Sequence, residues 1–130
     1  PWRPGARELL ESLVAQKVPC ALVTMSWESL ASAVVGSLPA GSFAAVVTGD
    51  VVKHGKPHPE PYLAAARLLG VDLGACVAIE DSPPGVASAV AAGIPTIAVP
   101  HHVTVPETPG AVQVPTLAGL VPSDLLRLFA

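Results

Sequence analysis

The stretch from Cys76 to Gly93 limits the possible fold more than any other part of the chain. It opens with four small or strand-forming apolar residues, continues with the adjacent acids Glu80 and Asp81, and then has Ser82 before two prolines. The residues that follow suit a helix that ends at a glycine. A strand that enters a helix through such a turn is the repeating half of a parallel α/β sheet, whose ligands bind beyond the carboxyl ends of the strands. We therefore expect both acids to lie at a ligand-binding edge.

Two interpretations of this acidic turn remain open. Neighbouring side chains of a strand point to opposite faces, but at the end of a strand both carboxylates can reach one site. A hard cation such as Mg²⁺ takes oxygen ligands from one or two carboxylates and completes its shell with water and phosphate. Alternatively, Asp81 or Ser82 only caps the next helix, with Pro83 in its first turn, which leaves Glu80 unexplained.

The rest of the chain alternates strand-like and helix-like segments. Short apolar runs predict strands at residues 18–23, 43–47, 76–79, 96–99 and 111–114. Apolar residues at helical spacing and capping residues predict helices at 6–17, 27–38 and 60–70, in the segment from Ser82 to Gly93, and in a terminal segment capped by Ser123. This alternation indicates a doubly wound, Rossmann-like parallel sheet in a single domain that covers residues 1–130.

Composition argues against several classes of function. The formal net charge is −3 and the Lys and Arg residues form no cluster, so we expect no nucleic-acid partner. The uncharged stretches 29–49 and 82–106 are interrupted by prolines and glycines, so neither predicts a membrane span. No basic segment followed by an apolar one opens the chain, and Cys20 and Cys76 lack the spacing of a zinc or redox pair. We expect a cytoplasmic protein with no membrane partner.

Two further residues are expected at the same edge as the acid pair. Thr24 ends the strand at 18–23 just before a helix, where its hydroxyl and the amides after it could hold a phosphate oxygen. Taken alone, a β-branched residue with a local hydrogen bond is the simpler interpretation of Thr24. Lys56 lies in a Gly-Lys-Pro turn and could neutralise phosphate or a carboxylate, although most loop lysines are simply solvated. Because the hydroxyl, the cation and the acid pair follow three different strands, together they predict a phosphoryl site.

Other polar residues give weaker signals. Asp50 either orders the Lys56 loop through a hydrogen bond or is only a turn residue. The four histidines show no metal-ligand spacing and are interpreted as loop residues, at positions 54, 58, 101 and 102. A nucleotide-binding Rossmann domain ranks last among the functions considered, because no Gly-x-Gly-x-x-Gly sequence follows a strand.

Four runs of the sequence resemble those of a known family in order and spacing. They are Pro-Gly-Ala-Arg-Glu-Leu-Leu-Glu-Ser-Leu, Ala-Leu-Val-Thr-Met-Ser, Gly-Asp-Val-Val-Lys-His-Gly-Lys-Pro-His-Pro-Glu-Pro-Tyr-Leu and Ile-Glu-Asp-Ser-Pro-Pro-Gly-Val-Ala-Ser-Ala-Val-Ala-Ala-Gly. The family is the haloacid-dehalogenase-like hydrolases, within them the phosphoglycolate phosphatase and β-phosphoglucomutase branch. The resemblance implies that the Thr24 hydroxyl and the Met25 amide hold the phosphoryl group and that Lys56 steadies its charge. It also implies that Glu80 and Asp81 carry Mg²⁺.

The sequence departs from the family in one respect. The family's first motif, an Asp-x-Asp strand, supplies the nucleophile and the general acid, and here no Asp precedes Asp50. Family topology places that strand between the strands at 18–23 and 76–79, so we expect two unpaired strand edges there. The resemblance thus implies the C-terminal core of a Mg²⁺-dependent phosphatase, inactive alone, that acts on a small phosphorylated substrate through an aspartyl phosphate. Its partner would be the missing N-terminal strand and cap segment. The alternatives are a phosphomutase and a non-catalytic phosphate-binding, metal-binding or assembly module.

Overall fold

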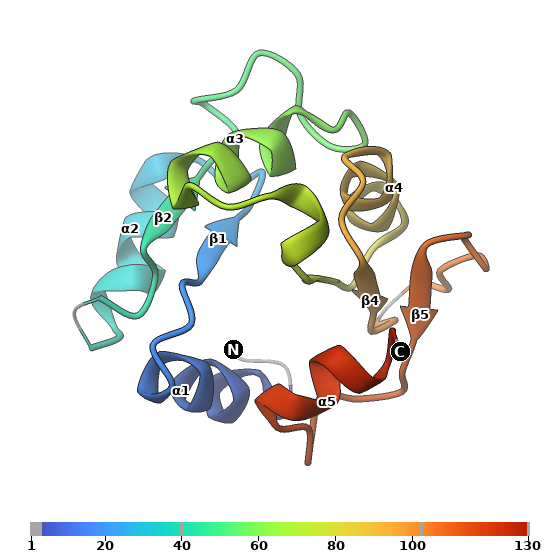
Figure 1. Ribbon diagram of the computed structural model, residues 1–130. Coiled ribbons are helices and arrows are strands. Elements are labelled where there is room, and N and C mark those ends of the chain that lie inside the picture. The colour runs from blue at the N-terminus through green and yellow to red at the C-terminus, as the bar shows by residue number, and fades with distance from the viewer. Residues whose placement is uncertain (1–3, 40, 102, 130) are drawn as a thin grey trace.

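The computed structural model describes residues 4–39, 41–101 and 103–129, in which helices and strands alternate along the chain (Figure 1). The helices are α1 (Ala6–Ala15), α2 (Glu28–Gly36), α3 (Glu60–Leu69), the 3₁₀ helix η1 (Leu73–Ala75), α4 (Pro83–Ala91) and α5 (Pro122–Arg127). The strands are β1 (Ala21–Val23), β2 (Ala45–Val47), β3 (Ala78–Glu80), β4 (Thr96–Ala98) and β5 (Ala111–Gln113). The predicted alternation is confirmed, and the strands are shorter than the apolar runs that predicted them.

All strand pairs are parallel, but the sheet is divided into two pieces. One piece pairs β1 with β2, and the other has the order β3-β4-β5. Within the described residues, β1 and β3 therefore each keep one edge without a backbone partner. The parallel α/β fold is confirmed. These are the two edges that were expected to be unpaired.

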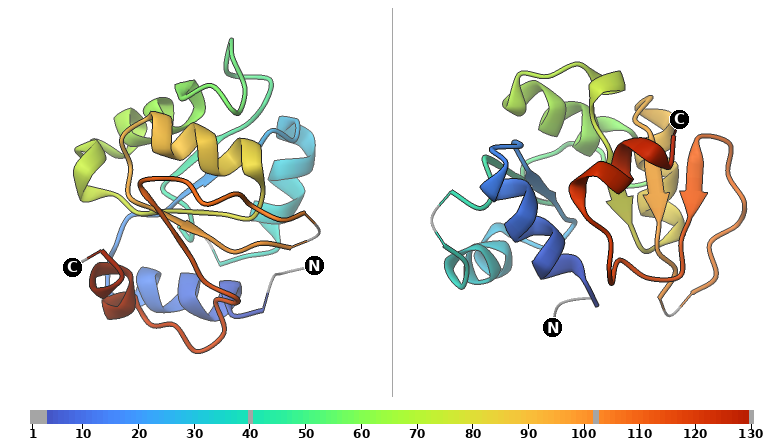
Figure 2. Two further views of the ribbon diagram at one scale, coloured as in Figure 1. Left: turned by 90° about the vertical axis from the view of Figure 1, so that its right-hand side faces the viewer. Right: turned by 60° about the horizontal axis from the view of Figure 1, so that its bottom comes forward.

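Helices cover both faces of these strands, as a doubly wound fold requires. On one face Leu9 of α1 and Leu125 of α5 pack with Ile97 and Val99 of the β4 segment. The contact between α1 and α5 is visible along the bottom of Figure 1. On the other face α3 and α4 pack on the strands, and Figure 2 shows the two layers from the side. The strands thus lie between two helical layers, which leaves their carboxyl ends as the place for a site.

Two helix ends test the predicted capping residues. Ser82 caps α4 as expected, because its Oγ accepts a hydrogen bond from the Gly85 amide at 3.3 Å. The prediction that Ser123 caps the terminal helix is wrong. Helix α5 begins one residue earlier, at Pro122, whose ring suits the first helical position and has no N–H to be capped. The Asp124 carboxylate instead accepts the Val121 amide at 2.9 Å.

The helices in the described part of the chain are short. The longest, α1 and α3, have 10 residues each, or about 15 Å at the usual rise per residue. None of the helices seen here has the length and apolar character needed to cross a bilayer.

The two cysteines, which the sequence excludes as a zinc or redox pair, are free and half-buried. Burial raises the pKa of the Cys20 thiol. Burial and, to a smaller extent, the nearby Asp72 carboxylate raise the pKa of the Cys76 thiol. Both side chains therefore favour the neutral thiol, which is poorly suited to metal binding or nucleophilic attack.

Candidate functional site

The residues expected at the site all follow the carboxyl ends of strands. Thr24 and Met25 come directly after β1, and Lys56 lies in the long connection from β2 to α3. Glu80 is the last residue of β3, and Asp81 begins the turn into α4. The structure brings two of them into direct contact, Lys56 and Glu80, and through Lys56 it connects this pair to β1 and to Met25.

The Lys56 side chain joins the ends of two strands that do not pair with each other. Its Nζ donates a hydrogen bond to the Val23 carbonyl oxygen of β1 at 3.0 Å. It also forms an ion pair with Oε2 of Glu80, and the two side chains are only 11% and 8% exposed. An ammonium has three N–H donors, and the described residues provide these two acceptors, so one donor remains for a further acceptor. A phosphate oxygen that approaches this edge can take that donor.

The Glu80 carboxylate is held from three sides. Oε2 accepts hydrogen bonds from Lys56 and from the hydroxyl of Tyr62. Oε1 lies against Gly85 in the first turn of α4, where a Cβ would come within 1.9 Å of it. Burial and then the negative charge of Glu80 raise the pKa of the Tyr62 hydroxyl far above its usual range. The carboxylate thus lies between the Lys56 ammonium, the Tyr62 hydroxyl and the first turn of α4.

The Thr24 hydroxyl keeps its proton available. Its Oγ accepts a hydrogen bond from the Ser26 amide at 3.2 Å, which is the local bond of the simpler interpretation. A hydroxyl that accepts one hydrogen bond can still donate its own proton. The Thr24 amide donates to the Val47 carbonyl oxygen of β2 at 2.9 Å, which fixes the backbone at the end of β1. The structure therefore holds Thr24 in a fixed position at the carboxyl end of β1.

Met25 contacts two other parts of the chain. Its side chain lies against the turn that carries Lys56, and its backbone lies against Gly49, in the connection that follows β2. The Lys56 amide donates to Sδ of Met25 at 3.4 Å. A Cβ added at Gly49 would come within 2.4 Å of the Met25 carbonyl oxygen, so only glycine allows this approach. These contacts hold the turn after β1 and the turn before Lys56 together.

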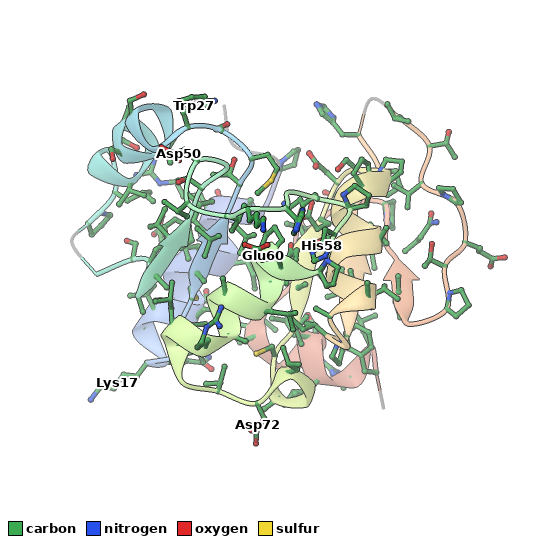
Figure 3. All side chains as sticks on the ribbon, turned by 90° about the horizontal axis from the view of Figure 1, so that it is seen from above. Lys17, Trp27, Asp50, His58, Glu60 and Asp72 are labelled. Atoms are coloured by element: carbon green, nitrogen blue, oxygen red, sulfur yellow. The ribbon has the colours of Figure 1, made fainter. Side chains whose placement is uncertain are left out.

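Glu60, which sequence reasoning did not select, orders the loop that carries Lys56. Its carboxylate accepts the Lys53 amide at 2.8 Å and the His54 amide at 3.0 Å. The hydrogen bond from the Lys53 amide is the main reason why the pKa of Glu60 is lowered. Asp50, the residue considered for this role, accepts a hydrogen bond from the Thr48 hydroxyl. Figure 3 looks down on this edge and labels both Asp50 and Glu60.

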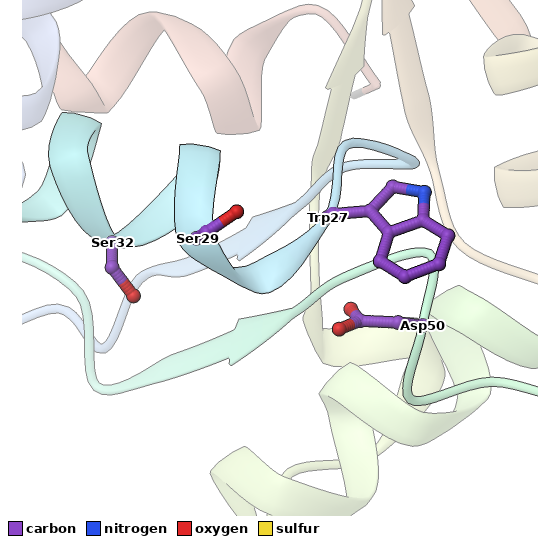
Figure 4. Close-up of a pocket in the computed structure, with 4 residues that line it drawn as sticks. All are labelled: Trp27, Ser29, Ser32 and Asp50. Atoms are coloured by element: carbon purple, nitrogen blue, oxygen red, sulfur yellow. The ribbon is translucent and has the colours of Figure 1, made fainter.

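A surface depression of about 450 Å³ lies beside the N-terminal end of α2 (Figure 4). It is lined by Trp27, Ser29, Ser32 and Asp50. The Trp27 side chain is 72% exposed. None of the residues predicted for phosphate or metal binding lines this depression, so it is separate from the Lys56 and Glu80 contacts.

The acid pair offers oxygen ligands of the kind that Mg²⁺ prefers. Asp81 is exposed at the strand end, whereas Glu80 is buried and shares Oε2 between two donors. Across residues 4–39, 41–101 and 103–129, no group of three or more His, Cys, Asp or Glu side chains is placed to hold a metal ion. Mg²⁺ commonly binds through one or two carboxylates and keeps several waters beside substrate phosphates. The two carboxylates fit such an ion, with Asp81 as the more accessible ligand.

Comparison with known proteins defines the family. The family model for haloacid dehalogenase-like hydrolases matches residues 1–93, and the chain therefore belongs to this family, as its motifs predicted. Hexitol phosphatase A of Escherichia coli is 44% identical over 98 residues, which cover 74% of this chain and 44% of that protein. The plasmid CbbY protein of Cupriavidus necator is 38% identical over 104 residues, which cover 77% and 41%. The chain thus spans less than half the length of these two relatives.

Solved structures confirm the fold. The structure of CbbY from Rhodobacter sphaeroides in complex with phosphate has a TM-score of 0.86 and 29% identity, and covers 95% of this chain and 58% of that chain. A β-phosphoglucomutase from Clostridium difficile has a TM-score of 0.82 at 23% identity, and covers 98% and 56%. At that identity the second structure supports the fold alone. The chain adopts part of the Rossmann-like core of the family.

Proposed function

We propose that this chain forms the phosphate- and magnesium-binding part of a cytoplasmic phosphatase-type hydrolase that acts on a small phosphorylated metabolite. The observation that carries the proposal is the Lys56 ammonium, which is anchored by Val23 and Glu80 and retains one N–H for a ligand. Similar proteins support a phosphate site, since one is a hexitol phosphatase and a CbbY structure holds phosphate. We treat residues 1–130 as one domain in this proposal.

The proposed roles follow from the donors at the strand ends. The Thr24 hydroxyl and the Met25 amide bind oxygens of the phosphoryl group, and Lys56 supplies positive charge to it. Donors that are fixed before the substrate arrives stabilise the developing charge at no further cost in reorganisation. In phosphoryl transfer this positioning and charge stabilisation account for most of the catalysis.

Asp81 and Glu80 are the proposed ligands of Mg²⁺. When bound, the ion supplies charge neutralisation at a phosphoryl oxygen. Asp81 is exposed at the strand end, so it is the more accessible of the two carboxylates. Glu80 has a second function in this proposal, since its charge balances that of Lys56.

The phosphoryl acceptor is proposed to be an aspartate on a strand that inserts between β1 and β3. The unpaired edges of these two strands support the proposal. In the proposed reaction an oxygen of the first aspartate attacks phosphorus, the bond to the substrate oxygen breaks, and that oxygen takes a proton from the second aspartate of the Asp-x-Asp strand, the general acid. Water then cleaves the acyl phosphate and releases inorganic phosphate. The chain alone is therefore expected to be inactive.

Phosphate binding tests the site without requiring turnover. Binding of inorganic phosphate to the chain is measured by calorimetry in the presence of Mg²⁺. We expect Lys56→Ala to weaken the affinity at least about tenfold, because a charged hydrogen bond is lost. Lys53→Ala is the matched control, since Lys53 is an exposed loop lysine three residues away. Equal affinity of the two variants would remove the basis of the proposal.

Activity tests the missing acceptor. Release of inorganic phosphate from a sugar phosphate is followed for the chain alone and with a peptide that carries an Asp-x-Asp strand. Turnover by the chain alone refutes the proposed incompleteness, and no turnover with a bound peptide counts against the enzyme. Transfer to a second sugar without release of phosphate indicates a phosphomutase. A partner strand that binds without an aspartate favours the assembly module.

A further inference from the structure

Tyr62 carries a hydroxyl that core packing does not require. It is the only tyrosine of the chain and is 7% exposed, in the first turns of α3. Its ring packs in a cluster with Ala78, Ala89 and Ile94. A phenylalanine would fill the same space without a buried polar atom, and a buried hydroxyl is costly unless it is hydrogen-bonded. The hydroxyl is satisfied by one acceptor, Oε2 of Glu80.

Tyr62 contacts both members of the ion pair at the site. Its hydroxyl donates to the same Glu80 oxygen that pairs with Lys56. The Lys56 ammonium also lies 5.5 Å from the centre of the Tyr62 ring, within the range of a cation–π interaction. The carboxylate cannot move toward α4 without meeting the backbone of Gly85. The ammonium and the carboxylate are therefore both fixed with respect to one aromatic side chain.

The three side chains differ in how much freedom they have to lose. Lysine and glutamate are long and lose considerable rotamer freedom when they are fixed. Tyr62 has two rotatable bonds, and its ring is already held by the core cluster. It is therefore the rigid element to which the two flexible charged side chains are attached.

We propose that Tyr62 is a positioning residue that holds Glu80 and Lys56 together, so that Lys56 presents its remaining N–H to a bound phosphate. This inference rests on the proposed function for the phosphate. It adds a residue that acts through Lys56 and does not itself touch the substrate.

Two matched variants test the role of the hydroxyl. Tyr62→Phe removes the hydroxyl and keeps the ring. Thr96→Val removes another fully buried hydroxyl, which donates to the Ile94 carbonyl oxygen at 2.7 Å and lies at the start of β4. Two quantities are measured for the 130-residue chain: the slowly exchanging ammonium signal of Lys56 in ¹⁵N NMR spectra, and the affinity for inorganic phosphate with Mg²⁺.

We expect Tyr62→Phe to abolish the slow exchange of the Lys56 ammonium and to weaken phosphate binding by roughly three- to tenfold. Thr96→Val should change neither quantity. An unchanged Lys56 signal in Tyr62→Phe overturns the proposal, and so does an equal loss in Thr96→Val. If the wild-type chain binds no phosphate, the proposed function fails, while the Lys56 signal still decides whether Tyr62 positions the lysine.

A further measurement does not depend on the folding of a variant. A buried hydroxyl that is hydrogen-bonded to a carboxylate exchanges its proton slowly with water. Because the chain has a single tyrosine, its hydroxyl proton is assigned without ambiguity. A slowly exchanging hydroxyl signal in the wild-type spectrum supports the proposal. A hydroxyl proton in fast exchange in the folded wild-type chain overturns it.

Discussion

Gly85→Ala tests whether the Glu80 carboxylate is held where the structure places it. Gly85 lies in the first turn of α4 and is buried. An alanine Cβ there would come within 1.9 Å of Oε1 and 2.3 Å of Cδ of Glu80. Neither distance is possible between atoms that are not bonded, so the carboxylate has to leave its position.

The expected magnitude follows from the contacts that are lost. Displacement of the carboxylate breaks the hydrogen bond from Tyr62 and the ion pair with Lys56. Each hydrogen bond to a charged group contributes about 1.5–3 kcal/mol. Alanine in place of glycine returns about 1 kcal/mol in a helix. Since the displaced carboxylate also regains some contact with water, we expect the free energy of unfolding to fall by about 2–4 kcal/mol.

Urea denaturation followed by circular dichroism measures this change. Gly36→Ala is the matched control, because Gly36 ends α2 and an added Cβ there meets no atom of the described structure within 4 Å. We expect Gly36→Ala to leave the free energy of unfolding unchanged or to raise it by up to about 1 kcal/mol.

A double-mutant cycle identifies the neighbour responsible. In a Glu80→Ala background the carboxylate is absent, so Gly85→Ala should lose its cost and show only the gain in helix propensity. A Gly85→Ala variant as stable as the wild type would refute the reasoning. If Gly85→Ala still lowered the free energy of unfolding in the Glu80→Ala background, the clash would be with another neighbour.

Three further changes test the surroundings of the site. Gly49→Ala places a Cβ 2.4 Å from the Met25 carbonyl oxygen, so we expect about 1–3 kcal/mol less stability in urea titrations. Glu60→Gln should speed the hydrogen exchange of the Lys53 and His54 amides, which donate hydrogen bonds to the Glu60 carboxylate. Because the pKa of Glu60 is lowered on folding, its stabilisation is present above about pH 4.3 and lost below it. The pKa of Tyr62 is raised, so stability should fall above about pH 10, by at most about 1.4 kcal/mol per pH unit.

Each of these changes has its own control. Gly74→Ala meets no described atom within 4 Å and is the comparison for Gly49→Ala; equal losses would contradict the proposed clash. Unchanged exchange of the loop amides in Glu60→Gln would show that the carboxylate does not order the loop. For the alkaline range, the thermal stability of the wild type and of Tyr62→Phe is measured as a function of pH. The difference between them separates the contribution of the tyrosine from those of the lysines and cysteines. If the stability of the wild type and that of Tyr62→Phe changed with pH in the same way above pH 10, the raised pKa of Tyr62 would be contradicted.

The sequence predicted the fold class correctly, and it predicted that Lys56 and Glu80 lie at one edge of the sheet, where the structure brings them into contact. Strand ends are visible as apolar runs followed by polar residues, which is how Thr24, Lys56 and Glu80 were selected. Tyr62 was not selected, because it continues the apolar face of α3 together with Ala65 and reads as a core residue. Its acceptor is 18 residues away, and only the packing of α3 against β3 brings the two together. A lone tyrosine on a core face, which needs a partner for its hydroxyl, was the available signal.

Strand length was predicted less well than the order of the elements. The apolar runs at 18–23 and 76–79 suggested strands of four to six residues. Three residues of the first run, Ala21–Val23, and two of the second, Ala78 and Ile79, are in strands, and the strand at the second run extends to Glu80. A strand with a partner on one side has half of the ladder bonds of a central strand. The unpaired edges of β1 and β3 mark the division of the sheet. Strand β4 pairs on both sides and is equally short, so an unpaired edge does not by itself set the strand length.

Lys56 connects the site to this division of the sheet. Its ammonium bonds the Val23 carbonyl oxygen at the end of β1 and the Glu80 carboxylate at the end of β3, and these strands share no backbone ladder in the described residues. We expect a strand that pairs with both edges to bring the two anchors to a fixed separation, and a phosphate bound by Lys56 to favour the same arrangement. Two ligands that favour one arrangement strengthen each other's binding by the same factor. The proposed acceptor strand and the phosphate are therefore thermodynamically linked through a single side chain.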